Sequence, residues 1–505
     1  MNGFDVIVVG SGSSGGTLAA RLSENPDRSV LLLEAGQVFR SAGEMPVELL
    51  EPSRISAAIP GEPTTWTFQA EMTPGRRVPY ARGKVMGGSS TINACYFVRG
   101  TKQDFDTWAR LGNDEWAFDR VLPVFTRLET DRDFAGPYHG ASGPVQVSRQ
   151  AGLAPEFASA FDASCRALGF ADDPDKNAPD SRGGIGPLPM NIADGVRYGS
   201  AMAYLLPAMG RPNLRVVGGA LVQKVLFDGQ TAIGIQALVD GRLQNYYADE
   251  VVLSAGALNT PQVLMLSGVG PAEHLREHGI DVVHDLPGVG QGLSDHAMVG
   301  AAWESSARLS EDLTKGSVNP ILHCAVEGGE IEIIPFVLTN EAMLGLGGNE
   351  GGTASIAVVM LQPESRGTVS LGSADATDLP VPRWNLLSAQ ADRVSLREGV
   401  RLAAEIFDQQ ALRGIGGRLS GFPEDLSDTA ALDAWLDQNV AAGHPSSTCR
   451  MGPTSDPGAV VDQRLRVYGL DRLHIADASV FPTLTSRGPN ATSFLVGERA
   501  AELLG

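Results

Sequence analysis

The sequence predicts an α/β protein with two domains: one built on a largely parallel sheet assembled from discontinuous segments, and an α+β domain with a mostly antiparallel sheet. Three observations support this fold class. An apolar strand runs into a glycine-rich turn within residues 5–36, a second strand-to-glycine passage follows far downstream at 251–270, and the pattern changes character between 300 and 438. A chain of 505 residues is also too long for one simple core.

The first segment has the order of a Rossmann-like, dinucleotide-binding βαβ unit. Residues 6–9 are an apolar β-branched run, residues 10–16 are rich in glycine, and residues 17–22 have helical apolar spacing. A second apolar run at 30–33 then ends in Glu34. Strand, glycine turn, helix, strand and acid within about thirty residues predict a bound nucleotide cofactor. The motif fits FAD or NAD, and its place at the N-terminus favours FAD.

Each residue type in this turn has a physical task. Gly10 permits the tight turn, and Gly12 lets the backbone approach a pyrophosphate. Gly15 allows the following helix to pack closely, with its N-terminal N–H groups facing the phosphates. The Glu34 carboxylate is expected to accept hydrogen bonds from the adenosine ribose.

Composition narrows the class of protein. Lys and Arg total 39 against 59 Asp and Glu, a formal net charge of −20. Nucleic acid and anionic membrane surfaces attract basic patches, so neither is an expected partner. The four cysteines lack paired spacing, which argues against disulfides and zinc. Without a signal-like N-terminus or an apolar run of roughly 18 residues, the sequence predicts a cytoplasmic protein with no transmembrane segment.

The remaining patterns assign segments to the two domains. Residues 1–145, 205–300 and 440–505 are predicted to form the cofactor domain, and 146–204 and 301–439 the substrate domain. Helical spacing covers 105–128, with Trp108 and Trp116 expected in the core, and further helices are expected at 258–266, 392–408, 430–440 and 493–503. A β-meander is expected at 216–239, turning at Asp228-Gly229. Further strands are expected at 330–336, 357–361, 367–371 and 473–476. Residues 41–75 are expected to be an excursion outside the core.

Two further stretches carry candidate chemistry. Residues 82–93 combine glycines and serines densely enough to bring backbone N–H groups close to a bound ring or phosphate. Near the C-terminus, His444 opens a run of small polar residues and Asn490 follows a second such run. A histidine titrating near neutrality can accept a hydroxyl proton, and a neighbouring amide can bind the same oxygen. The other seven histidines, His296 included, have no suggestive neighbours, and no HxH or HExxH spacing predicts a metal.

Together these motifs resemble the glucose–methanol–choline (GMC) oxidoreductase family over essentially the whole chain. The N-terminal unit is similar to its FAD-binding fingerprint. Residues 83–93 resemble the first family signature, with Met86 at a position where a smaller aliphatic is usual. Residues 256–270 resemble the second signature, and 286–296 the loop after it, with Gly292 where Asn is typical.

The resemblance implies an extended FAD pocket under a sheet-based substrate domain, with His444 and Asn490 as the catalytic pair. Covalent members attach FAD through a histidine at the position of Ile92, so non-covalent FAD is expected here. By the same analogy, Val222 meets the adenine, Asn93 and Ala94 the flavin edge, and Asp477 the pyrophosphate or ribityl region. The full expected cofactor set is Gly10, Gly12, Ser13, Ser14, Gly15, Glu34, Ala35, Arg82, Gly87, Gly88, Ser90, Asn93, Ala94, Val222, Ala255, Asp477, Ala478, Asn490 and Ala491.

Two positions depart from the family pattern, and a separate run resembles one subgroup of the family. Ser447 replaces the usual glycine of the histidine motif, and Thr492 replaces the proline after Asn490-Ala491. Residues 485–489 are similar to mycofactocin-associated GMC dehydrogenases, which pass electrons to a respiratory acceptor. Phe336 and Met360 are the nominated substrate-pocket side chains.

The predicted function is FAD-dependent oxidation of an alcohol by proton abstraction and hydride transfer to flavin N5. The expected partners are a small alcohol and an electron acceptor, which is oxygen, a quinone or another respiratory acceptor; a homo-oligomer is compatible with the sequence. Two other enzymes fit parts of the pattern: a GMC-like lyase that holds flavin without redox use, and a nicotinamide-dependent dehydrogenase. A non-catalytic flavin-binding protein is a third reading.

Overall fold

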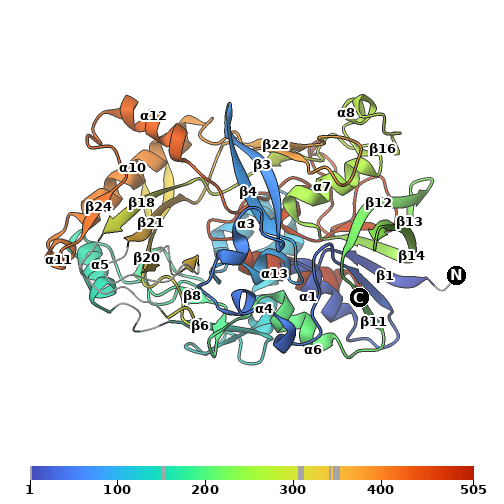
Figure 1. The fold of residues 1–505 in the computed structure, drawn as a ribbon, viewed down its shortest axis with the longest axis horizontal. Coiled ribbons are helices and arrows are strands. Elements are labelled where there is room, and N and C mark those ends of the chain that lie inside the picture. Colours follow the sequence, from blue (N-terminus) through green and yellow to red (C-terminus); the bar gives the residue numbers. More distant parts are fainter. Residues whose placement is uncertain (1–2, 151, 153–154, 305–311, 340–342, 345–352) are drawn as a thin grey trace.

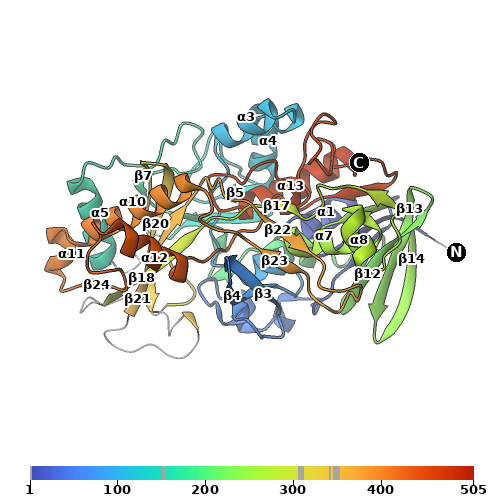
Figure 2. The ribbon, with the colours of Figure 1, turned by 90° about the horizontal axis from the view of Figure 1, so that it is seen from above.

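The computed structural model describes residues 3–150, 152, 155–304, 312–339, 343–344 and 353–505. Two sheet-based bodies lie side by side, with both chain ends on the same body (Figures 1 and 2). One body holds a parallel sheet drawn from distant segments and the other an antiparallel sheet, so the predicted fold class is confirmed.

The parallel sheet is the centre of the first body. Its strands, in spatial order, are β11 (Leu214–Val217), β2 (Val30–Leu33), β1 (Phe4–Val9), the C-terminal half of β14 (Arg242–Leu253) and β25 (Leu473–Ile475). β1 lies between β2 and β14, with Val8 opposite Leu32 on one side and Val252 on the other. All three side chains are fully buried, as expected for apolar β-branched runs covered on both faces. The first half of β14 forms the predicted meander with β13 (Thr231–Val239) and β12 (Ala220–Asp228).

Helices α1 (Ser13–Leu22) and α13 (Asn490–Leu504) pack against each other beside this sheet. The Ser14 hydroxyl donates to the Ser493 carbonyl at 2.6 Å. A Cβ on Gly497 would lie 2.4 Å from the Ser14 carbonyl oxygen, so only glycine allows this approach. The first helix of the chain is thereby fixed to the last one, and α13 begins at Asn490, three residues before the predicted start.

The second body is a six-stranded antiparallel sheet backed by helices. Its strands, in spatial order, are β24 (Arg418–Ser420), β18 (Met298–Glu304), β21 (Thr353–Met360), β20 (Gly329–Thr339), β19 (Ile321–Val326) and β7 (Gly184–Gly186). Helix α10 (Gln390–Phe407) packs on β20 and β21, with α5 (Pro155–Ala167), α11 (Gln410–Gly414) and α12 (Thr429–Asn439) around it. Ile331, Ile333 and Met360 belong to the core cluster that includes Leu396 of α10.

A third sheet corrects the prediction for residues 41–75. Residues 65–73 are not an excursion: they form strand β3 (Thr65–Thr73), which pairs with β4 (Arg76–Gly83) in the hairpin standing between the two bodies in Figure 1. The alternation that marks this strand was present, because Phe68, Ala70 and Met72 are buried and separated by more polar residues. The sheet continues through β23 (Val381–Arg383) and β22 (Gly367–Ser370) to β17 (Gln291–Leu293), so it joins segments up to about 300 residues apart in the chain. The exact domain boundaries stay a prediction.

Smaller elements connect these sheets. The predicted helix at 105–128 is interrupted by Gly112, whose φ is 93°, into α3 (Lys102–Arg110) and α4 (Phe118–Leu128), and Trp108 and Trp116 are fully buried as predicted. In the described residues no helix is long and apolar enough to cross a membrane. The remaining elements are η1 (Ala42–Glu44), α2 (Val47–Leu50), η2 (Ser56–Ala58), η3 (Gly88–Thr91), η4 (Asp114–Trp116), β5 (Glu129–Asp131), β6 (Val145–Arg149), β8 (Pro189–Met190), β9 (Ile192–Ala193), β10 (Val196–Arg197), η5 (Ala201–Leu205), α6 (Leu206–Ala208), α7 (Gly256–Leu266), β15 (Val269–Gly270), α8 (Ala272–Glu277), β16 (His284–Asp285) and η6 (Ala478–Val480).

A buried charge network ties β5 and β6 to the following loops. The His139 imidazole lies 3.0 Å from the Asp131 carboxylate through Nδ1 and 2.8 Å from Asp175 through Nε2. Glu129, Asp131 and His139 are close enough together to share a metal ion. Two guanidinium groups already neutralise the carboxylates, with Arg99 2.5 Å from Glu129 and Arg149 2.8 Å from Asp131. We therefore assign this cluster to stability.

Because of the His139 network, the free energy of unfolding should decrease as the pH becomes alkaline. Burial alone would lower the pKa of His139, but hydrogen bonds to Asp131 and Asp175 outweigh it and raise the pKa to about 10. A pKa raised on folding stabilises fully below the unfolded value near 6.5, and this stabilisation is lost as pH rises towards 10. The urea midpoint of the wild type should therefore fall between pH 6.5 and 10 by more than that of His139→Gln. His278→Gln, a change at a histidine outside this network, should follow the wild type; identical slopes in all three proteins would contradict the assignment.

Candidate active site

A crevice opens at the carboxyl ends of β1, β2 and β14, where ligands bind in open α/β sheets. It encloses about 1130 Å³ of space between protein atoms, which includes its open mouth. The lining comes from segments that are distant in sequence: Val9, Gly10, Ser11, Gly12, Ser13, Ser14, Leu33, Glu34, Ala35, Trp66, Arg82, Gly83, Gly88, Ser89, Ala220, Leu221, Val222, Ser254, Ala255, Gly256, Ala257, Leu258, Asn259, Gln262, Val263, Leu266, Ala376, Pro445, Asp477, Ala478 and Ser493.

The glycines of the N-terminal turn shape one wall. Gly10 has a φ of 94°, and a Cβ there would lie 2.4 Å from the Ser254 carbonyl oxygen. A Cβ on Gly15 would lie 2.0 Å from the Gly10 carbonyl oxygen, so this glycine is needed for the turn to close on the helix. A Cβ on Gly12 would meet no protein atom within 4 Å and would project into open space on the crevice wall. The turn is therefore held rigidly while its middle is left open for a ligand at the N-terminus of α1.

Glu34 is fixed at the end of β2. Its Oε2 accepts hydrogen bonds from the Ser11 backbone N–H at 3.0 Å and the Ser11 hydroxyl at 2.5 Å, and its Oε1 accepts from the Gly36 N–H at 2.7 Å. Burial raises the pKa of Glu34, against these hydrogen bonds and the charge of Lys84. A carboxylate has about four lone-pair sites, so three hydrogen bonds leave capacity for a ribose hydroxyl.

Asp477 organises the opposite wall. Its Oδ2 accepts from the Gly256 N–H at 2.9 Å and the Thr260 hydroxyl at 2.6 Å, and its Oδ1 accepts from the Ser479 N–H at 2.8 Å. Burial is the main cause that raises its pKa. These contacts join the start of α7 to the loop after β25 and place Asp477 and Ala478 on the crevice surface.

Most of the predicted cofactor residues line this crevice. Those on its surface are Gly10, Gly12, Ser13, Ser14, Glu34, Ala35, Arg82, Gly88, Val222, Ala255, Asp477 and Ala478. Others act behind it: the Ser90 hydroxyl donates to the Gly87 carbonyl, the Gly87 N–H donates to the Ser11 hydroxyl, and Ala491 is fully buried in α13. Asn93 and Ala94 are half-buried in the loop after η3. Trp66 and Ser11 belong to the site but were not predicted; Trp66 lies on the strand that the sequence did not reveal.

Hydrogen bonds from the backbone of His444 and Gly443 to Asp295 fix the position of His444. The Asp295 Oδ1 accepts hydrogen bonds from the N–H groups of Gly443 at 3.0 Å and His444 at 2.5 Å. Its Oδ2 accepts from Trp384 Nε1 at 2.8 Å. Burial raises the pKa of Asp295 to about 6, with these hydrogen bonds opposing the rise. Pro445, the next residue, lines the crevice, so the histidine stands at the edge of the cofactor space.

The imidazole of His444 pairs with a second histidine. His444 Nδ1 lies 2.9 Å from Nδ1 of His296, and Nε2 of His296 lies 2.9 Å from the Thr485 carbonyl oxygen. The two rings meet edge to face, with centroids 5.1 Å apart and an interplanar angle of 87°. Burial lowers the pKa of His296 to about 4, and burial, together with the charge of Arg82 and the charge that His296 would carry if protonated, holds the pKa of His444 well below its ordinary value. Both rings are neutral near pH 7.

Asn490 sits at the start of α13, close in sequence to Thr485. Its Nδ2 donates to the Tyr96 carbonyl at 3.0 Å and lies 3.4 Å from Asn191 Oδ1. The second contact is longer than the usual 2.7–3.2 Å range. Thus one amide proton is firmly bonded, and the other is only weakly bonded, which leaves it able to donate to an additional acceptor. His444 is connected through His296 to Thr485, which lies five residues before Asn490. Both predicted catalytic residues are therefore linked to one short segment.

His296 and Asp295 were missed by sequence reasoning. The signal was their place in the glycine-rich loop 286–296, immediately after a family-like motif. Their relation to His444 is purely spatial: the backbones of Ser294 and Ser446 pair through reciprocal N–H···O bonds of 3.1 and 3.0 Å. No spacing rule within one sequence reveals a bridge across 152 residues.

Comparison with known proteins decides the family. Residues 4–298 match the N-terminal part of the family described as GMC oxidoreductase, and residues 363–497 match its C-terminal part. The chain belongs to the GMC oxidoreductase family. A relative named as an uncharacterised GMC-type oxidoreductase in the thcA 5′ region of Rhodococcus erythropolis is 40% identical, over 99% of this chain and 98% of its own. The oxygen-dependent choline dehydrogenase of Vibrio vulnificus is 35% identical, over 99% of this chain and 94% of its own.

Solved GMC structures share the fold along the whole chain. The pyridoxine 4-oxidase from Mesorbium loti superposes with a TM-score of 0.89 at 30% identity, covering 99% of this chain and 98% of its own. A formate oxidase reaches 0.90 at 24% identity, covering 100% and 98%, and supports the fold alone. Membership of the GMC family confirms the predicted FAD cofactor and the class of oxidoreductase acting on alcohol-type substrates.

Two glycines of the turn separate cofactor binding from folding. Gly12→Ala should leave the unfolding midpoint of the flavin-free protein unchanged, because the new methyl meets no protein atom, but it should weaken FAD binding about tenfold or more by filling the phosphate approach. Gly15→Ala should lower stability by roughly 1–3 kcal/mol through overpacking against Gly10. Flavin fluorescence titration and thermal unfolding of both variants measure the two effects. Full FAD affinity in Gly12→Ala would show that the phosphates lie elsewhere.

Proposed function

We propose that this GMC oxidoreductase oxidises an alcohol at its CH–OH carbon, with His444 as the base and Asn490 as its partner. The observation that carries the proposal is the position of the His444 imidazole, fixed through Asp295 and His296 at the edge of the FAD crevice. FAD, when bound there, supplies the acceptor for the hydride that leaves the carbon. The protein's own residues supply binding, orientation and proton transfer.

The two side chains divide the work on the substrate oxygen. His444 accepts the hydroxyl proton, which its depressed pKa allows at neutral pH. Asn490 donates the amide proton of its long contact with Asn191 to the same oxygen, without rotation of the amide, and stabilises the developing negative charge. Its shorter bond to Tyr96 keeps the amide in place throughout.

The cofactor is held without a covalent bond in this proposal. Ile92, which occupies the position where covalent relatives carry histidine, is 4% exposed and offers no nucleophile. The predicted phosphate, ribose and adenine contacts fall to the Gly10–Ser14 turn, Glu34 and Val222 on the crevice wall.

A primary alcohol is the substrate class that the relatives support. Choline and pyridoxine, for which a 35% and a 30% identical relative are named, both carry primary hydroxyl groups. Phe336 packs against the same small buried cluster as Tyr96, whose carbonyl accepts a hydrogen bond from Asn490, whereas Met360 lies in the core shared with α10. We propose Phe336, and no longer Met360, as a substrate-side residue.

His444→Ala should slow anaerobic flavin reduction by about 10² or more, the scale for loss of a general base. In the wild type the base is unprotonated at neutral pH, so the reduction rate should be flat from about pH 6.5 to 9 and fall only at more acidic pH, as His444 gains a proton. Stopped-flow bleaching of the flavin by a panel of primary alcohols measures both. An oxidised spectrum with every alcohol would favour a lyase, and unchanged reduction in His444→Ala would remove the base assignment. Parallel assays with oxygen and a dye identify the acceptor.

A further inference from the structure

We infer that His296 is a positioning residue that fixes the His444 imidazole in the tautomer with its proton on Nδ1, leaving Nε2 as the basic atom. The inference rests on the proposed role of His444 and names the device that makes it a base. It follows from two hydrogen bonds and the burial of one ring.

The proton positions are determined from the Thr485 carbonyl outward. A carbonyl oxygen can only accept, so the 2.9 Å contact requires a proton on Nε2 of His296. A neutral imidazole carries one N–H, which leaves Nδ1 of His296 as an acceptor. The 2.9 Å contact between the two Nδ1 atoms then requires the proton to belong to His444. Its Nε2 is consequently unprotonated.

The surroundings keep His296 in the neutral state that this logic needs. Its side chain is fully buried, which disfavours a charged ring. Hydrogen bonds to the Thr485 and Leu361 carbonyls favour protonation, but burial outweighs them, and the buried Arg487 adds a positive charge nearby that opposes protonation further. The adjacent Asp295 carboxylate is already engaged by the N–H groups of Gly443 and His444 and by Trp384.

The consequence is a directional relay of hydrogen bonds rather than a second base. When His444 takes a proton on Nε2, it becomes an imidazolium whose Nδ1–H still points at the lone pair of His296. That hydrogen bond stabilises the cation in its buried site, and it strengthens as charge forms. His296 gains no proton and loses none; it orients its partner and stabilises the charged form.

Two isosteric replacements divide the functions of the His296 ring. Asn places its amide oxygen near the position of Nδ1, so His296→Asn keeps an acceptor for His444 while losing the bond to Thr485. Gln places its amide nearer the position of Nε2, so His296→Gln keeps the bond to Thr485 and loses the acceptor. We expect flavin reduction in His296→Asn to stay within about tenfold of the wild type, and in His296→Gln to fall by roughly 10²–10⁴, the scale of a wrong tautomer.

The tautomer is also visible without turnover. In protein carrying ¹⁵N-labelled histidine, with and without FAD, the His444 resonances should show a protonated Nδ1 and an unprotonated Nε2, assigned by their loss in His444→Ala. In His296→Gln the two forms should mix or reverse, while His296→Asn should keep the wild-type pattern. Urea midpoints of both variants report any general loss of folding.

The possible outcomes separate this inference from the proposed function. Loss of flavin reduction in His444→Ala with full activity and an unchanged His444 spectrum in His296→Gln would overturn the role of His296 and leave the base in place. Normal reduction in His444→Ala would overturn the base itself. Equal losses in His296→Asn and His296→Gln, with the wild-type tautomer in both, would show that the ring only fills space.

Discussion

The close approach of the first and last helices is the constraint on which the site depends. Gly497 in α13 lies against the backbone at Ser14 in α1, and the Ser14 hydroxyl is bonded to Ser493. The glycine turn that opens α1 lies on the cofactor crevice, and Asn490 opens α13. The contact between α1 and α13 therefore fixes the position of the cofactor crevice relative to Asn490. A larger side chain at this contact would displace both at once.

Desolvation does most of the chemical preparation. The same burial that raises the pKa of Glu34, Asp295 and Asp477 lowers that of His296 and His444. Backbone N–H and hydroxyl groups donate hydrogen bonds to the carboxylates, which hold the segments around the crevice in place. The rings of the two histidines are hydrogen-bonded to each other and to the Thr485 carbonyl rather than to a carboxylate, and burial keeps both neutral, which is the state that a base requires. Neutral imidazoles and compensated carboxylates coexist because each receives a different set of neighbours.

How far the sequence predicts this structure depends on whether a signal is local. The strand, glycine turn and acid of the first βαβ unit obey short-range rules, and β1, α1, β2 and Glu34 lie where predicted. His444 and Asn490 were predicted through family motifs, and their catalytic roles remain a proposal. His296 was not, because its meaning comes from a contact across 148 residues. Strand β3 was missed for a different reason: its alternation lies in a segment whose Pro, Ser and Glu content suggested an irregular loop.

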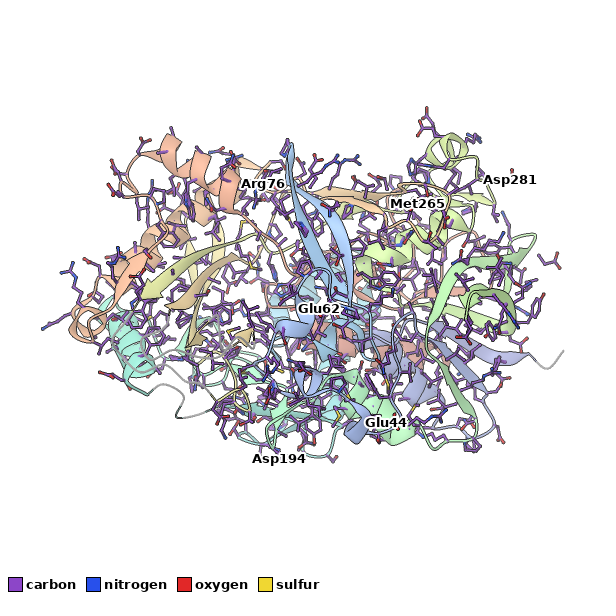
Figure 3. All side chains as sticks on the ribbon, viewed as in Figure 1. Glu44, Glu62, Arg76, Asp194, Met265 and Asp281 are labelled. Carbon is purple, nitrogen blue, oxygen red and sulfur yellow. The ribbon has the colours of Figure 1, made fainter. Side chains whose placement is uncertain are left out.

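The β3–β4 hairpin connects regions that would otherwise belong to separate bodies. Near its tip, Arg76 (labelled in Figure 3) donates Nη1 to the Val440 carbonyl at 2.6 Å, and near its base Arg82 donates to the Gly443 carbonyl at 2.9 Å while also lining the crevice. Gly75, at the tip, is exposed and open around its Cα. The hairpin thus extends from solvent at Gly75 to the cofactor crevice at Arg82. A fluorophore attached at its tip would sense, from a distance, any shift of the backbone that carries the base.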